Sequence, residues 1–155
     1  MKIGVISDTH NFFDPQIPEL FKDVEHIIHA GDVGSMAILA ELEKIAPVTA
    51  VTGNTDSMLP LKDVEVFELG RQKFVLQHIV QTDTPTVLLS HRVQQAKPDV
   101  IVFGHTHKPF NRTIGGIWYF NPGYAGKTRF GLERSVALLH FDRDKIRPEF
   151  LKLEE

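Results

Sequence analysis

Two histidines separated by one residue stand at the end of an apolar run, and this pair offers metal-binding chemistry. The run Val100–Phe103 leads through Gly104 into His105-Thr106-His107. A turned backbone with one intervening residue can aim both imidazoles to one side, where a divalent metal takes such nitrogens at roughly 2.0–2.1 Å. A polar loop with one hydrogen-bonded histidine is the alternative for the pair alone. Partners elsewhere in the chain must decide between the two.

Four other apolar runs also end in a polar side chain that can bind a metal. These donors are Asp8, His10, Asp32, Asn54 and His78, and they follow the runs Lys2–Ser7, Glu25–Ala30, Val48–Thr52 and Lys73–Gln77. Each has an alternative interpretation when taken singly. Aspartate and asparagine are common at helix caps and turns, and a lone histidine at a strand end is often a core residue. His26 and His29 lie before a strand end, so we assign them to structure.

Together these positions make seven nitrogen and oxygen donors, all beyond the ends of predicted strands. Such a set suits two divalent cations that share one carboxylate. Two cations roughly 3.5–4 Å apart lower the pKa of a shared water towards about 7 and grip the oxygens of a phosphoryl group during in-line attack. The carboxamide of Asn54 coordinates through oxygen without adding negative charge. The set therefore predicts hydrolysis of a phosphate ester by a metal-bridging hydroxide.

The elements that position these donors follow the order β-α-β-α-β, and a strand-rich second half comes after them. Helices are expected over Glu19–Lys22 after Pro18, from an N-cap at Ser35 to Ile45, and from an N-cap at Thr84 to Ala96. Between the second and the third of these helices in the sequence, two short strands joined by a turn at Gly70 are expected to form a hairpin. The remaining strands are predicted at 112–114, 117–120, 136–141 and 147–153. This order is typical of a mixed α/β fold with more than one sheet.

Composition sets limits on the class of protein. A chain of 155 residues suits one domain over 1–155, and its net charge of −3 gives no reason to expect long nucleic acid or a membrane as partner. There is no cysteine, so a metal must be held by nitrogen and oxygen ligands. The first apolar run is too short for a signal peptide, and no segment approaches the roughly 20 apolar residues of a membrane span. We expect a cytoplasmic location.

The order of these motifs resembles the calcineurin-like metallophosphoesterases. The motifs that carry the resemblance are Asp8-x-His10, Gly31-Asp32, Gly53-Asn54, His78 and Gly104-His105-x-His107, and they span nearly the whole chain. Asn121-Pro122-Gly123 and the small size make the chain similar to the short bacterial and archaeal phosphodiesterase branch. The resemblance implies an α/β fold of two facing mixed β-sheets flanked by helices.

The resemblance also implies the ligand set and the cofactors. One metal would take Asp8, His10, Asp32 and His107, and the other would take Asp32, Asn54, His78 and His105, with Asp32 as the bridge. These seven residues are therefore both the metal-binding and the catalytic candidates. Family habit puts Mn²⁺ first, with Fe, Ni, Co or Zn as alternatives. A small phosphodiester is the expected substrate, and the sequence leaves open whether the chain forms a homo-oligomer.

Three departures from the family pattern carry predictions of their own. Thr55 stands where many relatives have histidine, and a threonine hydroxyl is a poor general acid near neutral pH. This departure predicts either a preference for substrates with good leaving groups or a general acid elsewhere in the chain, such as His10. Ile79 follows His78 at a position where relatives often have glycine, so the backbone there has less conformational freedom. Tyr124 stands where serine is usual and is expected to narrow the pocket.

Several residues outside the ligand set also have predicted roles. Asp56 is expected to orient a metal ligand. The basic residues Lys127, Arg129 and Arg134 are interpreted as solvated charge, although such a cluster can also hold a phosphate.

Three alternative functions stay open. One is a catalytically weak or inactive protein-binding scaffold of the same fold, as in retromer-type relatives. The complete donor set speaks against it, because clustered polar groups without a metal are costly. A nuclease is disfavoured by the negative charge and by the lack of an aromatic and basic strip. A monoesterase would need a cationic partner for the extra substrate charge, for which Lys127 and Arg129 are candidates.

Overall fold

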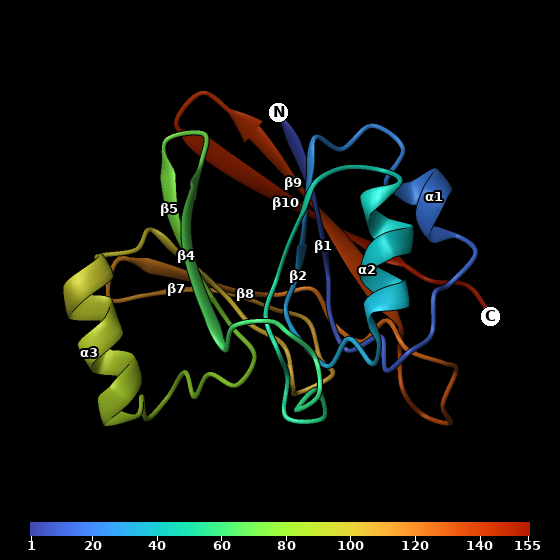
Figure 1. The fold of residues 1–155 in the computed structure, drawn as a ribbon. Helices are drawn as coiled ribbons and strands as arrows, with labels where there is room; N and C mark the ends of the chain where they lie inside the picture. Colours follow the sequence, from blue (N-terminus) through green and yellow to red (C-terminus); the bar gives the residue numbers. More distant parts are fainter.

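Two five-stranded mixed sheets face each other in the computed structural model, which describes all residues 1–155 (Figure 1). The first sheet has the order β10-β9-β1-β2-β3, and the second has the order β4-β5-β6-β8-β7. The first comprises β1 (Lys2–Ile6), β2 (His26–His29), β3 (Val48–Ala50), β9 (Ser135–Asp142) and β10 (Lys145–Lys152). The second comprises β4 (Val64–Leu69), β5 (Gln72–Gln77), β6 (Val100–Val102), β7 (Phe110–Ile114) and β8 (Ile117–Asn121). The predicted fold class is confirmed.

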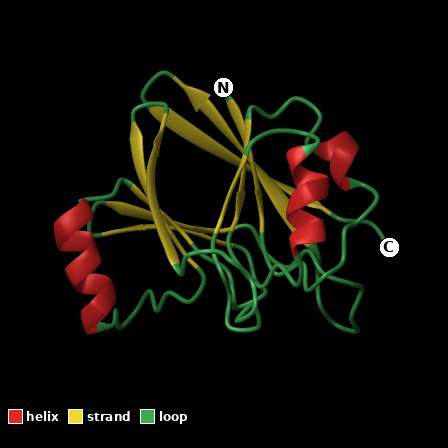
Figure 2. Cartoon of the chain, viewed as in Figure 1, coloured by secondary structure: helices red, strands yellow, loops and turns green.

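Three helices cover the outer faces of the two sheets. The helices α1 (Ile17–Leu20) and α2 (Met36–Glu43) lie on the first sheet, and α3 (Val87–Ala96) lies on the second (Figure 2). None of them is long and apolar enough to cross a membrane.

The core consists of three apolar layers. Ile3 and Val5 of β1 meet Phe74 and Leu76 of β5 between the sheets. A second layer lies under α1 and α2, and a third under α3, where Leu89 is buried. Alternate residues of β1 and β5 thus face the opposite sheet, as the two-residue period of a strand requires. Because the sheets share one apolar layer, we propose that residues 1–155 fold as one domain.

The parallel strands determine where the site can form. β1, β2 and β3 run parallel to one another, and so do β5, β6 and β8. All six therefore deliver the loops after their carboxyl ends to one side, where the long loops gather below the sheets in Figure 2. Open α/β sheets keep their ligand sites at this edge.

Two predictions about helix starts were wrong. α3 begins after an N-cap at Thr86, whose hydroxyl accepts a hydrogen bond from the Leu89 amide, and not after Thr84. α1 includes Pro18 in its first turn, where the missing amide proton costs nothing. Ser35 does stand at the N-cap of α2, but its hydroxyl donates to Asn11 and makes no capping bond.

Candidate metal centre

The structure brings all seven predicted donors together at the carboxyl ends of the parallel strands. Asp8, His10 and His107 form one group, and Asp32, His78 and His105 form another, with the ligand atoms of each group within 4.8 Å of one another. Asn54 joins the second group, because its Oδ1 lies 3.1 Å from both His78 Nε2 and His105 Nδ1. Residues from five loops thus meet in two adjacent clusters.

The first group contains buried polar atoms without hydrogen-bond partners. Asp8 is fully buried, and its Oδ1 accepts no hydrogen bond; His10 Nε2 likewise has no partner. The other carboxylate oxygen of Asp8 is held by the Ser7 hydroxyl at 2.6 Å and by the His105 amide at 3.1 Å. Asp8 Oδ1 faces His107 Nε2 at 3.3 Å and His10 Nε2 at 3.8 Å. Unpaired polar atoms in such a place are rare in folded proteins.

In the second group, the orientation of His78 is set by a backbone bond. Its Nδ1 donates to the Ala30 carbonyl at 2.7 Å, since a carbonyl can only accept. In the neutral ring, Nε2 then carries a lone pair, and it is directed at Asp32 Oδ2 at 3.2 Å. A histidine that donates through one nitrogen and offers the other to a group of oxygens has the arrangement usual for a metal ligand.

Asp32 lies between the two groups. Its Oδ2 is 3.2 Å from His78 Nε2 on one side and 3.7 Å from His10 Nε2 on the other. Its Oδ1 accepts hydrogen bonds from the backbone amide and the hydroxyl of Thr55, at 2.9 and 2.8 Å. Burial by itself would raise the pKa of Asp32, but the Thr55 hydrogen bonds and the nearby imidazoles hold it below its ordinary value. The carboxylate is therefore charged and fixed in orientation.

The backbone at the donors is strained. Five of the seven have positive φ although none is glycine: Asp8 (58°), His10 (45°), Asp32 (53°), His105 (72°) and His107 (63°). Non-glycine residues adopt this region at a cost, and they cluster at functional sites where the surrounding fold enforces it. No local sequence pattern predicted these conformations.

Two glycines allow the donor loops to approach closely. A Cβ on Gly53 would lie 2.1 Å from Asp32 Oδ1, and one on Gly104 would lie 2.1 Å from the Ser7 hydroxyl and 2.7 Å from Asp8 Oδ2. No side chain fits at either position. The glycines before Asn54 and His105 are thus required by packing against the two aspartates.

Two polar side chains outside the donor set hold the loops in place. Asp56 accepts hydrogen bonds from the amides of Val33, Gly34 and Gly53, and so ties the loop after β2 to the loop after β3. These bonds fix the backbone of both loops, and an effect of Asp56 on a metal ligand stays a prediction. Asn121 donates to the Gly104 carbonyl and the Thr106 hydroxyl, and accepts from the Gly123 amide. Sequence reasoning gave Asn121 no role; the motif Asn121-Pro122-Gly123 was its signal.

Thr55 and Tyr124 differ from what their positions suggested. The Thr55 hydroxyl is engaged with Asp32 and is part of the support for that carboxylate. Tyr124 is only 1% exposed, so it does not narrow an open pocket. Its ring packs 4.7 Å from the ring of His107, and its hydroxyl donates to the Lys127 carbonyl. Tyr124 thus packs against the ring of His107 from within the protein interior.

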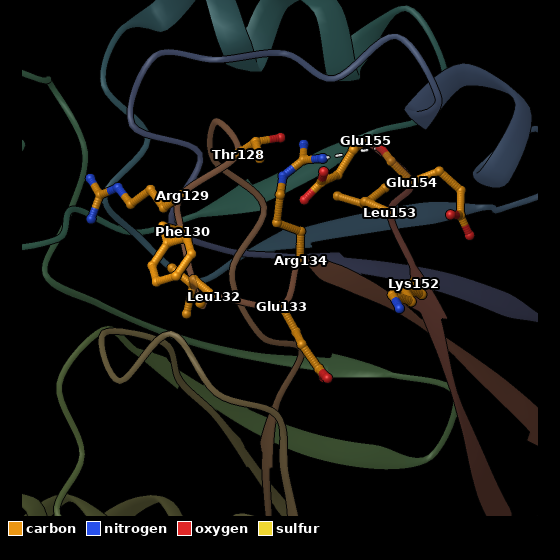
Figure 3. A pocket seen from close by; sticks show the side chains of 11 residues that line it. Thr128, Arg129, Phe130, Leu132, Glu133, Arg134, Lys152, Leu153, Glu154 and Glu155 are labelled. Carbon is orange, nitrogen blue, oxygen red and sulfur yellow. Dashed lines mark hydrogen bonds between the residues drawn. The ribbon is translucent and has the colours of Figure 1, made fainter.

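The basic loop after Tyr124 contains two arginines with different surroundings. Arg134 is buried, forms an ion pair with Asp14 and donates to the Gly126 carbonyl. It also donates to the Glu154 carbonyl in the C-terminal segment (Figure 3). Arg129 has no ion-pair partner; it extends away from the C-terminal segment in Figure 3, and its Cζ lies 5.3 Å from the centre of the Tyr124 ring. Arg134 is structural, whereas Arg129 leaves a cation beside the first group.

The histidines near Arg129 and in β2 have lowered pKa values. Burial lowers the pKa of His107, and the positive charge of Arg129 acts in the same direction, while the Asp8 carboxylate opposes it. Burial lowers the pKa of His29 to about 3. His29 accepts from the Gly31 amide and contacts the Thr9 hydroxyl, and so holds the loops of Asp8 and Asp32 from within the core. Its assignment to structure agrees with these contacts.

The donor set fits divalent cations. The atoms that meet in the two groups are carboxylate and carboxamide oxygens and imidazole nitrogens, and no lysine or arginine side chain forms an ion pair with Asp8 or Asp32. Carboxylates buried without a counter-charge are costly unless they coordinate a metal. Oxygen and nitrogen donors of this kind suit Mn, Fe, Co, Ni or Zn.

A family profile described as a calcineurin-like phosphoesterase superfamily domain matches residues 1–144. The chain belongs to this superfamily. A probable metallophosphoesterase of Methanothermobacter thermautotrophicus is 36% identical, and the match covers 98% of this chain and 92% of that protein. A phosphodiesterase of Methanocaldococcus jannaschii is 29% identical over 79% of this chain and 83% of its own length. The resemblance found in the sequence is confirmed, and the family indicates a metal-dependent phosphoesterase.

Among solved structures, the fold of this calcineurin-like chain is similar to that of Vps29 from Entamoeba histolytica. The TM-score is 0.77, the identity is 23%, and the match covers 99% of this chain and all of that chain. At this identity the likeness concerns the fold alone.

Proposed function

We propose that this chain is a dinuclear metal-dependent phosphodiesterase that acts on small substrates. The observation that carries the proposal is the set of atoms left without partners: Asp8 Oδ1 and His10 Nε2 are buried and unpaired, and the lone pair of His78 Nε2 faces a carboxylate. Such atoms repel one another unless cations lie between them. The phosphodiesterase among the relatives supports the same ester class.

The proposed ligand assignment follows the two groups. Asp32 contributes to both sites, which its position between His10 and His78 supports. The first site would also take Asp8, His10 and His107, and the second would also take Asn54, His78 and His105. Bound divalent cations supply positive charge to the phosphoryl oxygens and acidify the water that attacks phosphorus. Mn²⁺ is our first choice of metal, with Fe, Co, Ni and Zn as alternatives.

The chain itself contributes fixed positions. Thr55 holds Asp32, the Ser7 hydroxyl and the His105 amide hold Asp8, and the Ala30 carbonyl holds the ring of His78. Donors that do not reorganise during the reaction are a large part of what an enzyme supplies.

No proton donor for the leaving group is evident at Thr55. Its hydroxyl is engaged with Asp32, and His10 directs Nε2 at the two carboxylates and not at the solvent. We therefore expect the alcohol to depart as an anion and the rate to fall steeply as the pKa of the leaving alcohol rises. A flat dependence of kcat on that pKa would contradict this part of the proposal.

The test is metal-dependent hydrolysis by the purified chain. The protein is stripped of metal, Mn²⁺ is added back, and hydrolysis of bis-p-nitrophenyl phosphate is measured beside p-nitrophenyl phosphate. We expect diester hydrolysis that needs the metal and is lost in Asp32→Asn, while Asp142→Asn, which alters an exposed carboxylate, keeps it. Two equivalents of bound metal should be found by elemental analysis. Absence of hydrolysis with Mn²⁺, Fe²⁺, Co²⁺, Ni²⁺ and Zn²⁺ would refute the proposed activity.

A protein-binding scaffold is the alternative function. The observation that favours it is a group of exposed apolar side chains near the site, with Ile79 44%, Val87 88% and Leu88 59% exposed. Stoichiometric metal binding without turnover of either ester would favour the scaffold. The cytoplasmic location and the oligomeric state stay predictions without a structural test.

A further inference from the structure

A cavity of ≈ 290 Å³ opens directly beside the second group of donors. Asn54 and His78 form part of its wall, and the rest comes from the start of β4, the end of β5 and one face of α3. Pockets for small molecules range over roughly 300–1,000 Å³, so this cavity has room for one ring-sized group and not for a chain of nucleotides. Whatever occupies it would touch the proposed metal ligands.

The wall combines an apolar part with one unpaired cation. Val64, Ile79 and Leu88 supply the aliphatic surface, and Arg92 supplies the charge. Leu88 and Arg92 are four residues apart on α3, so they lie on the same face of the helix. No carboxylate lies within ion-pair distance of Arg92, in contrast to Arg134 in the basic loop.

Hydrogen bonds hold Arg92 in place. Its Nη1 donates to Gln77 Oε1 at 2.9 Å, and the Gln77 amide group donates to the Ile79 carbonyl at 2.9 Å. A guanidinium has five N–H donors, and this contact uses one of them. The polar end of the cavity is thus fixed in position and keeps donors for an acceptor on a ligand.

We propose that this cavity is the subsite for one organic ester group of the substrate, and that it selects phosphodiesters whose group is a ring with a hydrogen-bond acceptor on its edge. The proposal rests on the phosphodiesterase function proposed above. The ring packs on Leu88 and Ile79, and its acceptor edge meets Arg92. A second phosphate does not suit the cavity, because the Asp63 carboxylate also lines it.

Binding of three phosphonates tests the subsite without requiring turnover. Methylphosphonate reports on the metal centre alone, phenylphosphonate adds the ring, and 4-nitrophenylphosphonate adds an acceptor edge. Their affinities for the metal-loaded chain are measured by titration calorimetry. We expect phenylphosphonate to bind about tenfold more tightly than methylphosphonate, because a ring leaves water for an apolar wall, and the nitro group to add a further several-fold.

Matched variants assign the effect to the cavity. Leu88→Ala should reduce the ring preference to about twofold, whereas Val87→Ala, on the neighbouring and more exposed residue, should keep it. Arg92→Gln should remove the nitro preference and Arg92→Lys should restore part of it, while Arg71→Gln, at the distant β4–β5 turn, should change nothing. Methylphosphonate affinity should be equal in all five variants, which shows that the fold and the metal centre are intact.

The results separate this proposal from the proposed function. If the wild-type chain binds methyl- and phenylphosphonate equally, or if Leu88→Ala keeps the ring preference, the subsite is refuted even when the diester is hydrolysed. If the ring preference depends on Leu88 but no ester is hydrolysed, the enzyme proposal falls, and the cavity stands as a ring-binding site but not as a substrate subsite. If no phosphonate binds, the subsite is refuted, and diester hydrolysis alone decides the enzyme proposal.

Discussion

Asp8 and Asp14 are both buried carboxylates, six residues apart, and they differ in whether a cationic side chain and hydrogen-bond donors surround them. Asp14 forms an ion pair with Arg134 and accepts two further hydrogen bonds from Gln16. Asp8 has no cationic side chain of the chain against it except histidine, and its Oδ1 has no hydrogen-bond partner. The negative charge of Asp14 is thus neutralised by an arginine of the protein itself. The negative charge of Asp8 can instead be neutralised by a bound cation. This is the difference between a structural carboxylate and a candidate metal ligand.

Disrupting the ion pair of Asp14 and Arg134 should have the largest effect on stability. Asp14→Asn leaves Arg134 buried without its counter-charge, and losing one partner of a buried pair costs about 3–5 kcal/mol of unfolding free energy. Urea unfolding monitored by circular dichroism measures this, with Asp142→Asn as the control. Per folded molecule, diester hydrolysis should be retained. A loss below about 1 kcal/mol would remove the distinction between the two carboxylates.

The same pair predicts an acid sensitivity. Burial alone would raise the pKa of Asp14, but hydrogen bonds from Arg134 and Gln16 outweigh it and hold the pKa below its ordinary value of 3.8. A lowered pKa in the folded state stabilises the protein above pH 3.8, and this stabilisation is lost as the pH falls through the folded-state value. The wild-type chain should therefore lose stability more steeply than Asp14→Asn below about pH 4 in acid titrations of the unfolding free energy.

Metal should stabilise the wild-type chain more than Asp8→Asn, because Asp8 belongs to the first proposed site only and the variant keeps the ligands of the second. At a free Mn²⁺ concentration 100 times the Kd, binding to the folded state adds about 2.7 kcal/mol, which corresponds to roughly 5–10 °C in Tm for a chain of this size. Asp8→Asn removes an uncompensated buried charge, so its metal-free form should be at least as stable as the wild type. Differential scanning calorimetry with and without Mn²⁺ measures both effects. An equal metal-induced rise in Tm in both proteins would exclude Asp8 as a ligand.

Thr55 should have a smaller effect, because it acts through Asp32. Thr55→Val keeps the shape and the backbone hydrogen bond but removes the hydroxyl that donates to Asp32 Oδ1. Losing a contact that orients a metal ligand costs about 10 to 100-fold in affinity or activity, and we expect the lower end, about 1.4 kcal/mol. Mn²⁺ titrations of diester hydrolysis give the value. Thr113→Val, on the exposed face of β7, is the control and should match the wild type.

Arg129 should have the smallest effect, and the effect should depend on the ester. The exposed guanidinium stands over the Tyr124 ring beside the first group, where it can attract the second negative charge of a phosphomonoester. Exposed charge pairs contribute about 0.2–1 kcal/mol, so Arg129→Gln should lower kcat/KM for p-nitrophenyl phosphate by about 1.4- to fivefold and leave the diester nearly unchanged. Equal losses for both esters would argue against a charge contact with substrate.

The sequence by itself indicated which candidate donors lie together and at which edge of the fold they lie. Each donor directly follows an apolar run, so a local pattern marks both the strand and the side chain at its end. Parallel strands then deliver those ends to the same edge, and this is why Asp8, Asp32, Asn54 and the histidines could be grouped from the sequence. Helix starts were less certain, because Thr84 and Thr86 are equally suitable caps within two residues of each other.

Only the tertiary structure decided what individual polar atoms do. Arg129 and Arg134 are alike in the sequence, yet Arg134 is an ion-pair partner of Asp14, 120 residues away, and Arg129 is not paired. Thr55 became a support for Asp32, His78 was oriented by the Ala30 carbonyl, and five non-glycine donors took positive φ. These features depend on contacts between residues distant in the sequence, and hydrogen bonds and ion pairs act only over a few ångströms. Their energies are therefore set after folding has brought the loops together, and no local pattern encodes them.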